Sequence, residues 1–130
     1  MYLSTGINDS PTIVGKATSA ITKGAFHAVK FDANGGIVLA GSGEKSVGLL
    51  IATTPEAVAA GEDVTVQIKE IGLWKAAAAV KAGDELTVGT AGAAKVAATG
   101  DYVLAEALEA AEAPGAVIKV QIVKSGKLPA

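Results

Sequence analysis

The sequence predicts an all-β protein, a small antiparallel β-barrel or sandwich with short helical turns that follows an extended N-terminal arm. Two observations predict it. Apolar segments of about four to eight residues alternate with clusters of Gly, Asp and Asn, which is the pattern of short strands joined by tight turns. In addition, Val66-Gln67-Ile68 recurs as Val120-Gln121-Ile122, displaced by 54 positions (120 minus 66). The residues around the phrase recur in style as well, which favours a duplicated β-unit.

Residues 1–20 are predicted to form the arm. They are polar, and the turn residues Asn8-Asp9-Ser10-Pro11 break any regular element before one short strand at Thr12-Ile13-Val14. The alternation from Phe26 to Phe31 then predicts a strand, and Asp32–Gly36 is a strong turn signal that leads into Ile37–Leu39. These two segments are therefore expected to pair as a hairpin.

The middle of the chain predicts a buried strand, a helical turn and two further extended segments. The run Val47–Ala52 is apolar throughout and long enough for a buried strand. Thr54–Gly61 has Thr at the N-cap, Pro at the first helical position and Gly after the end, which predicts a short helical turn. Val64–Ile68 alternates cleanly, and Ile71–Trp74 continues in extended form after a bend.

The second half follows the same order. Val80–Val88 corresponds to Ile21 and the residues after it, and Tyr102–Ala105 corresponds to the strand that begins at Val47. Leu104–Ala113 has high helix propensity on its own, but the repeat predicts that it begins as a strand and forms one helical turn only near residues 108–113. Val117–Val123 is the last predicted strand.

The expected organisation is an arm, residues 1–20, followed by a single β-rich domain, residues 21–130, with repeat halves at about 21–72 and 80–126. Chance similarity between two Val-rich strands is the alternative to a duplication. Aromatic residues make up only 4% of the chain, so its core is thin and association with copies of itself or with a partner is expected to add stability.

Composition excludes several classes of function. The net charge is −2, with acidic and basic residues mixed along the chain, so nucleic-acid binding is not expected. The absence of cysteine excludes disulfides, thiolate metal sites and cysteine nucleophiles. No apolar stretch approaches the ~20 residues that cross a bilayer. The first residues lack a basic and an apolar signal region, so we expect a soluble protein that no signal peptide exports.

The sequence contains no recognisable catalytic, cofactor-binding or metal-ligating constellation. His27 is the single histidine and is read as a structural residue of a strand. The carboxylate clusters lack the spacing of a calcium loop, the glycines lack a phosphate-loop setting, and no serine has the context of a nucleophile. We therefore expect a protein that is not an enzyme and has no cofactor or small-molecule substrate.

Trp74 is the one large amphipathic side chain of the sequence. A single Trp in a small-residue core fills much volume, so core packing is one interpretation. The other is an oligomer or interface anchor, because Trp is enriched at binding hot spots. The sequence does not separate the two.

The chain from Ala60 onward resembles the capsid decoration, or head cement, proteins of tailed bacteriophages. The resemblance lies in Ala60–Val66, Gly72–Ala77, Ala82–Val88 and Val117–Ile122, where a strand after Ala-Gly-Glu leads through a Gly-containing bend to a Gly-Asp turn and a further strand. The residues before Ala60 match in style more than in motif. The resemblance implies a structural virion protein without enzymatic activity.

The resemblance also implies a location and a partner. Such a protein binds the outer surface of the expanded phage head and clamps neighbouring major capsid subunits, often as a homotrimer at threefold or quasi-threefold positions. It is assembled in the host bacterial cytoplasm. As a hypothesis, the arm supplies the capsid contact by adding an edge strand or filling a groove, through the isolated apolar residues Tyr2, Leu3, Ile7, Ile13 and Val14.

Other classes remain as alternatives. Val80–Leu86 resembles the turn of lipoyl and biotinyl carrier barrels, but no lysine lies in the Asp-Lys or Met-Lys-Met setting that those domains modify. A carbohydrate-binding β-module usually presents several exposed aromatic side chains, whereas the five aromatics here are scattered. A small β-barrel hydrolase would need a nucleophile and a base, which the sequence does not offer.

Overall fold

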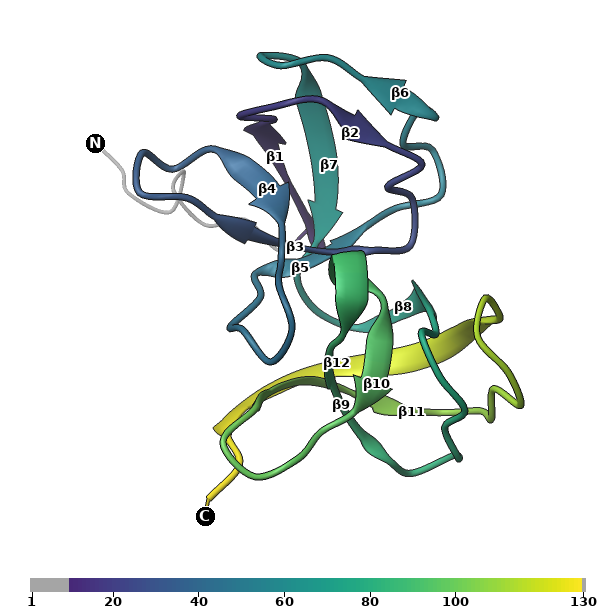
Figure 1. Ribbon diagram of the computed structural model, residues 1–130. Helices are drawn as coiled ribbons and strands as arrows, with labels where there is room; N and C mark the ends of the chain where they lie inside the picture. The colour runs from purple at the N-terminus through teal and green to yellow at the C-terminus, as the bar shows by residue number, and fades with distance from the viewer. Residues whose placement is uncertain (1–9, 130) are drawn as a thin grey trace.

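The computed structural model describes residues 10–129 and has two β-units that follow one another along the chain. Figure 1 shows the first unit above, with β1–β7, and the second below, with β8–β12. The strands of the first unit are β1 (Thr12–Lys16), β2 (Ile21–Thr22), β3 (Ala28–Phe31), β4 (Ile37–Leu39), β5 (Gly48–Leu50), β6 (Ala57–Val58) and β7 (Asp63–Gln67). Those of the second are β8 (Ile71–Lys75), β9 (Glu85–Val88), β10 (Ala94–Val96), β11 (Tyr102–Ala107) and β12 (Val117–Lys127).

The two units have the same strand order. The first sheet runs β1-β7-β5-β3-β4, and the second, read from its β8 edge, runs β8-β12-β11-β9-β10, with antiparallel pairing throughout both ladders. The registers agree too, since Thr12 pairs with Gln67 in the first unit and Ile71 pairs with Gln121 in the second. The recurring Val-Gln-Ile phrase therefore lies at equivalent places in two equivalent sheets.

Each sheet curls until its two edge strands meet at one point. A single parallel bridge joins Ala17, just after β1, to Ile37 of β4, and a matching bridge joins Ala76 to Ala94. One bridge does not continue a ladder, so neither sheet closes into a barrel. The fold is all-β and antiparallel, as the sequence predicts.

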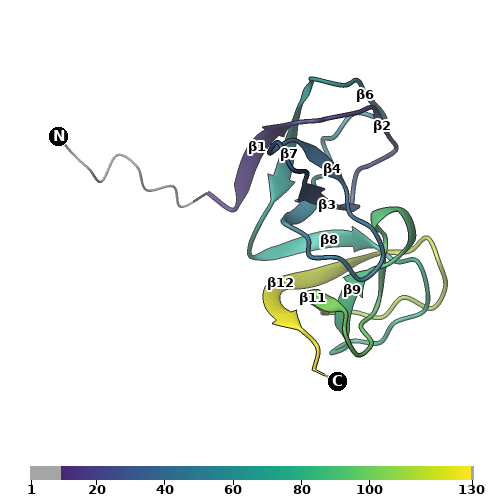
Figure 2. The ribbon, with the colours of Figure 1, turned by 60° about the vertical axis from the view of Figure 1, so that its left-hand side comes forward.

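Each curled sheet encloses an apolar core, and the two cores lie against each other. The first contains Ile21, Val29, Ile37, Leu50 and Val66 among others. The second is built around Trp74, Leu86 and Ile118, and it also takes in Ala28 and Leu49 from the first sheet. Backbone hydrogen bonds tie the units together, for example from the Lys75 N–H to the Phe26 carbonyl (2.9 Å). In Figures 1 and 2, β8 runs between the two units.

Both predicted helical turns are wrong. Residues 54–61 contain bends and β6, and residues 108–113 contain bends and a bridge between Val80 and Ala111. In both units, pairing with a segment far away in sequence replaces the helical turn. β6 pairs with β2, with Val58 opposite Ile21, and Ala111 pairs with Val80. A helix this short has a costly nucleus, so burial of Val58 and Ala111 decides the conformation. Among residues 10–129 the one helical element is η2, a 3₁₀ turn at Thr90–Gly92.

The units begin earlier than the expected repeat halves. β1 corresponds to β8, so the first unit starts at Thr12 and the second at Ile71, rather than near residues 21 and 80. The short strand expected at Thr12-Ile13-Val14 is present as β1, and it belongs to the sheet.

Trp74 is a core residue. Its side chain is 0% exposed, and its indole N–H donates a hydrogen bond to the Gly92 carbonyl (2.8 Å). A side chain with no exposed surface offers nothing to a partner chain, so the anchor interpretation of Trp74 does not fit this structure. The core-packing interpretation does.

Candidate interaction surface

Four acidic residues have structural roles in turns. Glu44, Glu62, Asp84 and Asp101 each accept a hydrogen bond from the backbone N–H of the residue three positions earlier, at 2.6, 2.6, 2.8 and 2.9 Å. The residue before each is a glycine with positive φ, between 72° and 92°, a conformation that residues with a Cβ rarely adopt. In the Gly-Glu and Gly-Asp pairs of the sequence, the glycine therefore allows the turn and the carboxylate stabilises it.

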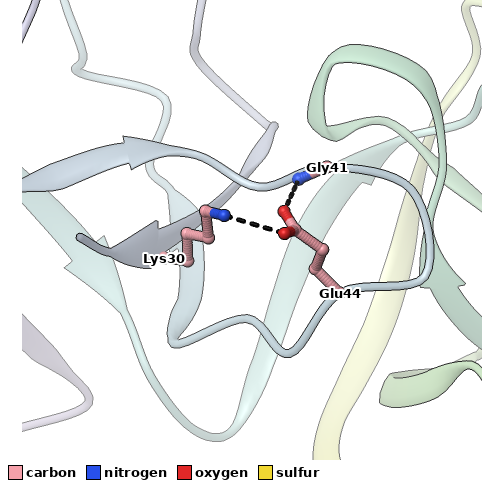
Figure 3. Close-up of polar contacts among 3 residues, drawn as sticks. All are labelled: Lys30, Gly41 and Glu44. Atoms are coloured by element: carbon pink, nitrogen blue, oxygen red, sulfur yellow. Dashed lines mark hydrogen bonds and ion pairs between the residues drawn. The ribbon is translucent and has the colours of Figure 1, made fainter. Parts of the chain in front are cut away.

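The carboxyl groups of Asp32 and Glu44 have a lowered pKa because hydrogen-bond donors surround them. The pKa of Asp32 is lowered first by the Thr18 hydroxyl and then by the backbone N–H groups of Gly36 and Asn34, which all donate to it. The pKa of Glu44 is lowered chiefly by Lys30, whose Nζ lies 2.8 Å from Oε2. Figure 3 shows that its other oxygen, Oε1, accepts the Gly41 N–H. Both carboxylates hold loops in place.

No group of side chains in the described part of the chain could hold a metal ion. The ring of His27 is hydrogen-bonded through Nδ1 to the Ala25 carbonyl (2.9 Å), so it faces its own loop. Within residues 10–129 there is also no helix long and apolar enough to span a bilayer.

Of the five residues expected to contact a capsid, three lie outside the described residues and two lie on β1. Tyr2, Leu3 and Ile7 lie outside the described residues. Ile13 and Val14 are neighbours on β1 and point to opposite faces: Ile13 packs against the core of the first unit, whereas Val14 is 65% exposed. Of this pair, only Val14 offers a free side chain.

The described chain starts beside the junction of the two units. The Ile68 N–H donates to the Pro11 carbonyl (2.7 Å), and Thr12 pairs with Gln67 at the end of β7. The Gln67 side-chain amide in turn donates to the Ile71 carbonyl (2.8 Å), at the first residue of β8. Figure 2 shows β1, β7 and β8 at this corner of the molecule. The first described residues, Ser10 and Pro11, therefore lie near the start of β8.

The outer face of β8 is apolar and exposed. Ile71 is 58% exposed and Leu73 40%, and Val117 and Lys119 of the paired strand β12 lie beside them. A concavity of about 390 Å³ lies where this face meets the first unit, and its lining includes Phe26, Ile51 and Gln67 together with Ile71–Leu73. We call the concavity and the exposed face of β8 the junction groove.

Sequence reasoning missed the junction groove. The segment Ile71-Gly72-Leu73-Trp74 was correctly expected to be extended, but it is apolar at three of its four positions and has Gly at the other. Period-2 alternation therefore gives no sign of which side chains face outward. The structure resolves this, because Trp74 is buried and Ile71 and Leu73 are exposed.

No protein-family model and no curated protein matches the chain. Among solved structures, the chain is similar to the head fiber gp8.5 N base of bacteriophage phi29, with a TM-score of 0.68 and 21% sequence identity. The alignment covers 92% of this chain and 98% of that chain. At this identity the similarity shows the fold. At the level of the fold, the resemblance to phage head proteins that the sequence indicated is confirmed.

Proposed function

We propose that this chain is a structural protein of a phage virion that binds the outer surface of the capsid and stabilises the expanded head. The observation that carries the proposal is the fold, which matches a base domain of a phage head fiber over nearly the whole of both chains. The sequence resemblance to capsid decoration proteins supports the same conclusion independently. The role is non-enzymatic, the partner is the major capsid protein, and nucleic acid and small-molecule substrates are not involved.

The junction groove and the N-terminal residues are the proposed capsid contact. Exposed apolar side chains in a concave surface favour binding of a protein segment, and Tyr2, Leu3 and Ile7 precede Thr12, which pairs with the groove residue Gln67. Val14 lies on the edge strand β1, and no strand among residues 10–129 continues the ladder on its outer edge along Thr12–Lys16, which favours strand addition there.

A binding assay with expanded heads tests this contact. The heads are those built from a major capsid protein encoded beside this chain, and bound protein is measured by co-sedimentation. Deletion of residues 1–9 is the first variant, since a longer deletion would remove β1 and destabilise the domain. Ile71→Asp is the second, and Val96→Asp is its matched control, because Val96 on β10 is exposed to a similar degree and does not line the junction groove.

We expect the deletion and Ile71→Asp each to weaken binding by about tenfold or more, because a buried interfacial charge or a lost apolar anchor costs on the order of 1.4 kcal/mol or more. Val96→Asp should bind like the parent protein. Equal binding by all three variants would reject the proposed contact, and absence of binding by the parent protein would reject the function. Stabilisation is tested separately by heating heads with and without the protein and measuring DNA release.

We further propose that the protein acts as a homotrimer at threefold or quasi-threefold positions. The small-residue core, with only 4% aromatic residues in the chain, supports a need for association. Sedimentation equilibrium of the free protein and counting of copies on heads measure the oligomer. A monomer at high concentration, together with single copies on the head, would reject the trimer.

A further inference from the structure

A second groove, lined by lysines, lies on a different part of the surface from the junction groove. It encloses about 410 Å³ and is lined by Lys30, Phe31, Lys45, Ser46, Val47 and Lys124. A smaller concavity of about 240 Å³ shares Lys45, Ser46 and Lys124 with it and extends past Tyr102 to Gly126. Residues from both β-units thus form one continuous surface, which we call the lysine groove.

Two of the three positive charges of the lysine groove, those of Lys45 and Lys124, have no ion-pair partner within the described part of the chain. No Asp or Glu lines either concavity. Lys30 is paired with Glu44, and Figure 3 shows that both oxygens of Glu44 are engaged, one by Lys30 and one by Gly41. The described residues provide no ion-pair partner for Lys45 or Lys124. Two cations therefore share a concave surface without an anion.

The environment of Lys124 indicates that its unpaired charge and that of Lys45 repel each other. Burial lowers the pKa of its ammonium group, and the neighbouring charge of Lys45 lowers it further. An anion placed between the two ammonium groups would relieve their repulsion. Such an anion would gain from both charges at once.

The groove is also held in shape before any ligand arrives. Lys45 stands between Glu44, which is fixed to Gly41 and Lys30, and Ser46, whose buried hydroxyl donates to the Val29 carbonyl (2.7 Å). Lys124 belongs to the long strand β12. The fixed backbone at Lys45 lowers the entropy that a ligand must remove on binding, whereas Lys124 lies in the irregular stretch of β12 between the pairs Ile122–Ala105 and Gly126–Val103.

The lining includes apolar surface next to the lysines. The ring of Phe31 is 49% exposed, and Val47 lies beside it in the lining. A simple inorganic anion would leave this surface in water. A ligand that carries both carboxylates and apolar side chains would use the whole groove.

We propose that the lysine groove binds an acidic segment of a partner protein, with carboxylates on Lys45 and Lys124 and an apolar side chain against Phe31 and Val47. Nucleic acid is the less favoured occupant, because all 11 basic residues of the chain are lysines, with no arginine to form bidentate phosphate contacts, and the net charge is −2. The proposal depends on the groove alone and stands whether or not the protein binds capsids.

The test uses a short, end-blocked, fluorescently labelled peptide that alternates Glu and Leu, titrated with the full chain and followed by anisotropy. A Gln-Leu peptide of the same length is the ligand control. The protein variant is Lys45→Gln/Lys124→Gln. Its matched control is Lys23→Gln/Lys81→Gln, which removes the same charge from exposed turns outside both concavities.

We expect the acidic peptide to bind the parent protein and the Gln-Leu peptide to bind it at least about tenfold more weakly, with affinity falling as salt increases. The groove variant should lose about fivefold or more, and the control variant should stay within about twofold. Amide shift mapping should place the peptide at Phe31, Lys45, Ser46 and Lys124, which also shows that the variants remain folded.

Three results would overturn the proposal. The first is equal affinity for the Glu-Leu and Gln-Leu peptides, and the second is equal loss of affinity in the two double variants. The third is tighter binding of a single-stranded oligothymidylate than of the acidic peptide, with the same dependence on Lys45 and Lys124, which would identify a nucleic-acid site instead.

Discussion

Replacement of Trp74 by Phe tests the assignment of this residue to the core. The substitution removes the hydrogen bond from the indole N–H to the Gly92 carbonyl and leaves a cavity beside Leu86 and Ile118, which belong to the same core cluster. An unpaired buried carbonyl costs about 1–3 kcal/mol, and full truncation of a buried Trp costs about 3–5 kcal/mol. We therefore expect Trp74→Phe to lower the free energy of unfolding by about 2–4 kcal/mol.

Urea unfolding followed by far-UV circular dichroism measures this change, since the variant lacks the only Trp and with it the usual fluorescence signal. Leu73→Ala is the matched control, because Leu73 precedes Trp74 on β8 but points outward and is partly exposed. It should cost less than about 1 kcal/mol. A Trp74→Phe variant within about 0.5 kcal/mol of the parent, or equal losses in both variants, would refute the reasoning.

Three further predictions concern single sites. Thr87 is fully buried, and its hydroxyl has no partner among the described residues, so Thr87→Val should leave thermal stability unchanged or raise it by up to about 1 kcal/mol. Gly15→Ala should destabilise by about 1–2 kcal/mol, because its Cβ would lie 2.7 Å from Cγ1 of buried Ile37; in an Ile37→Ala background, a double-mutant cycle should show a smaller loss. Asp32 and Glu44 have lowered pKa values when folded, so their contribution is full above their ordinary values of 3.8 and 4.5 and is lost as pH falls below them. The urea concentration at the unfolding midpoint should therefore decrease as the pH is lowered from about 6 to about 3, and the decrease should be smaller in Asp32→Asn.

The strands and turns of this fold could be predicted because their signals are local. The hairpin of β3 and β4 follows from the turn at Asp32–Gly36, and β7 follows from clean alternation. The repeat predicts β12 as far as Val123, whereas the strand continues to Lys127. The helical turns could not be predicted correctly. Their cap residues and Ala content are local signals too, but pairing with Ile21 and Val80, more than 30 residues away in sequence, decides their conformation.

The surfaces were harder to predict than the fold. The lysine groove brings together residues 30–31, 45–47 and 124, which no spacing rule connects. The junction groove depends on which face of β8 is buried, and a segment without polar residues at its first four positions does not show this. The sequence does not show which of the neighbours Ile13 and Val14 is available for a contact. The pleat of β1 directs Ile13 toward the core and Val14 outward.

The comparison of the two units explains why so little sequence similarity accompanies the same topology. If β1 is aligned with β8 by their pairing, Gly15 is equivalent to Trp74, and Ile37 is equivalent to Ala94 through the matching bridges. Large and small residues have thus exchanged places: Gly15 leaves room for Ile37 in the first unit, whereas Ala94 and Trp74 share the core of the second. Hydrophobic cores tolerate simultaneous substitution of neighbouring residues, so the topology persists while the identities of both members change. The Val-Gln-Ile phrase is retained at equivalent positions, where Val66 and Val120 both lie fully buried in strands that are paired on both sides.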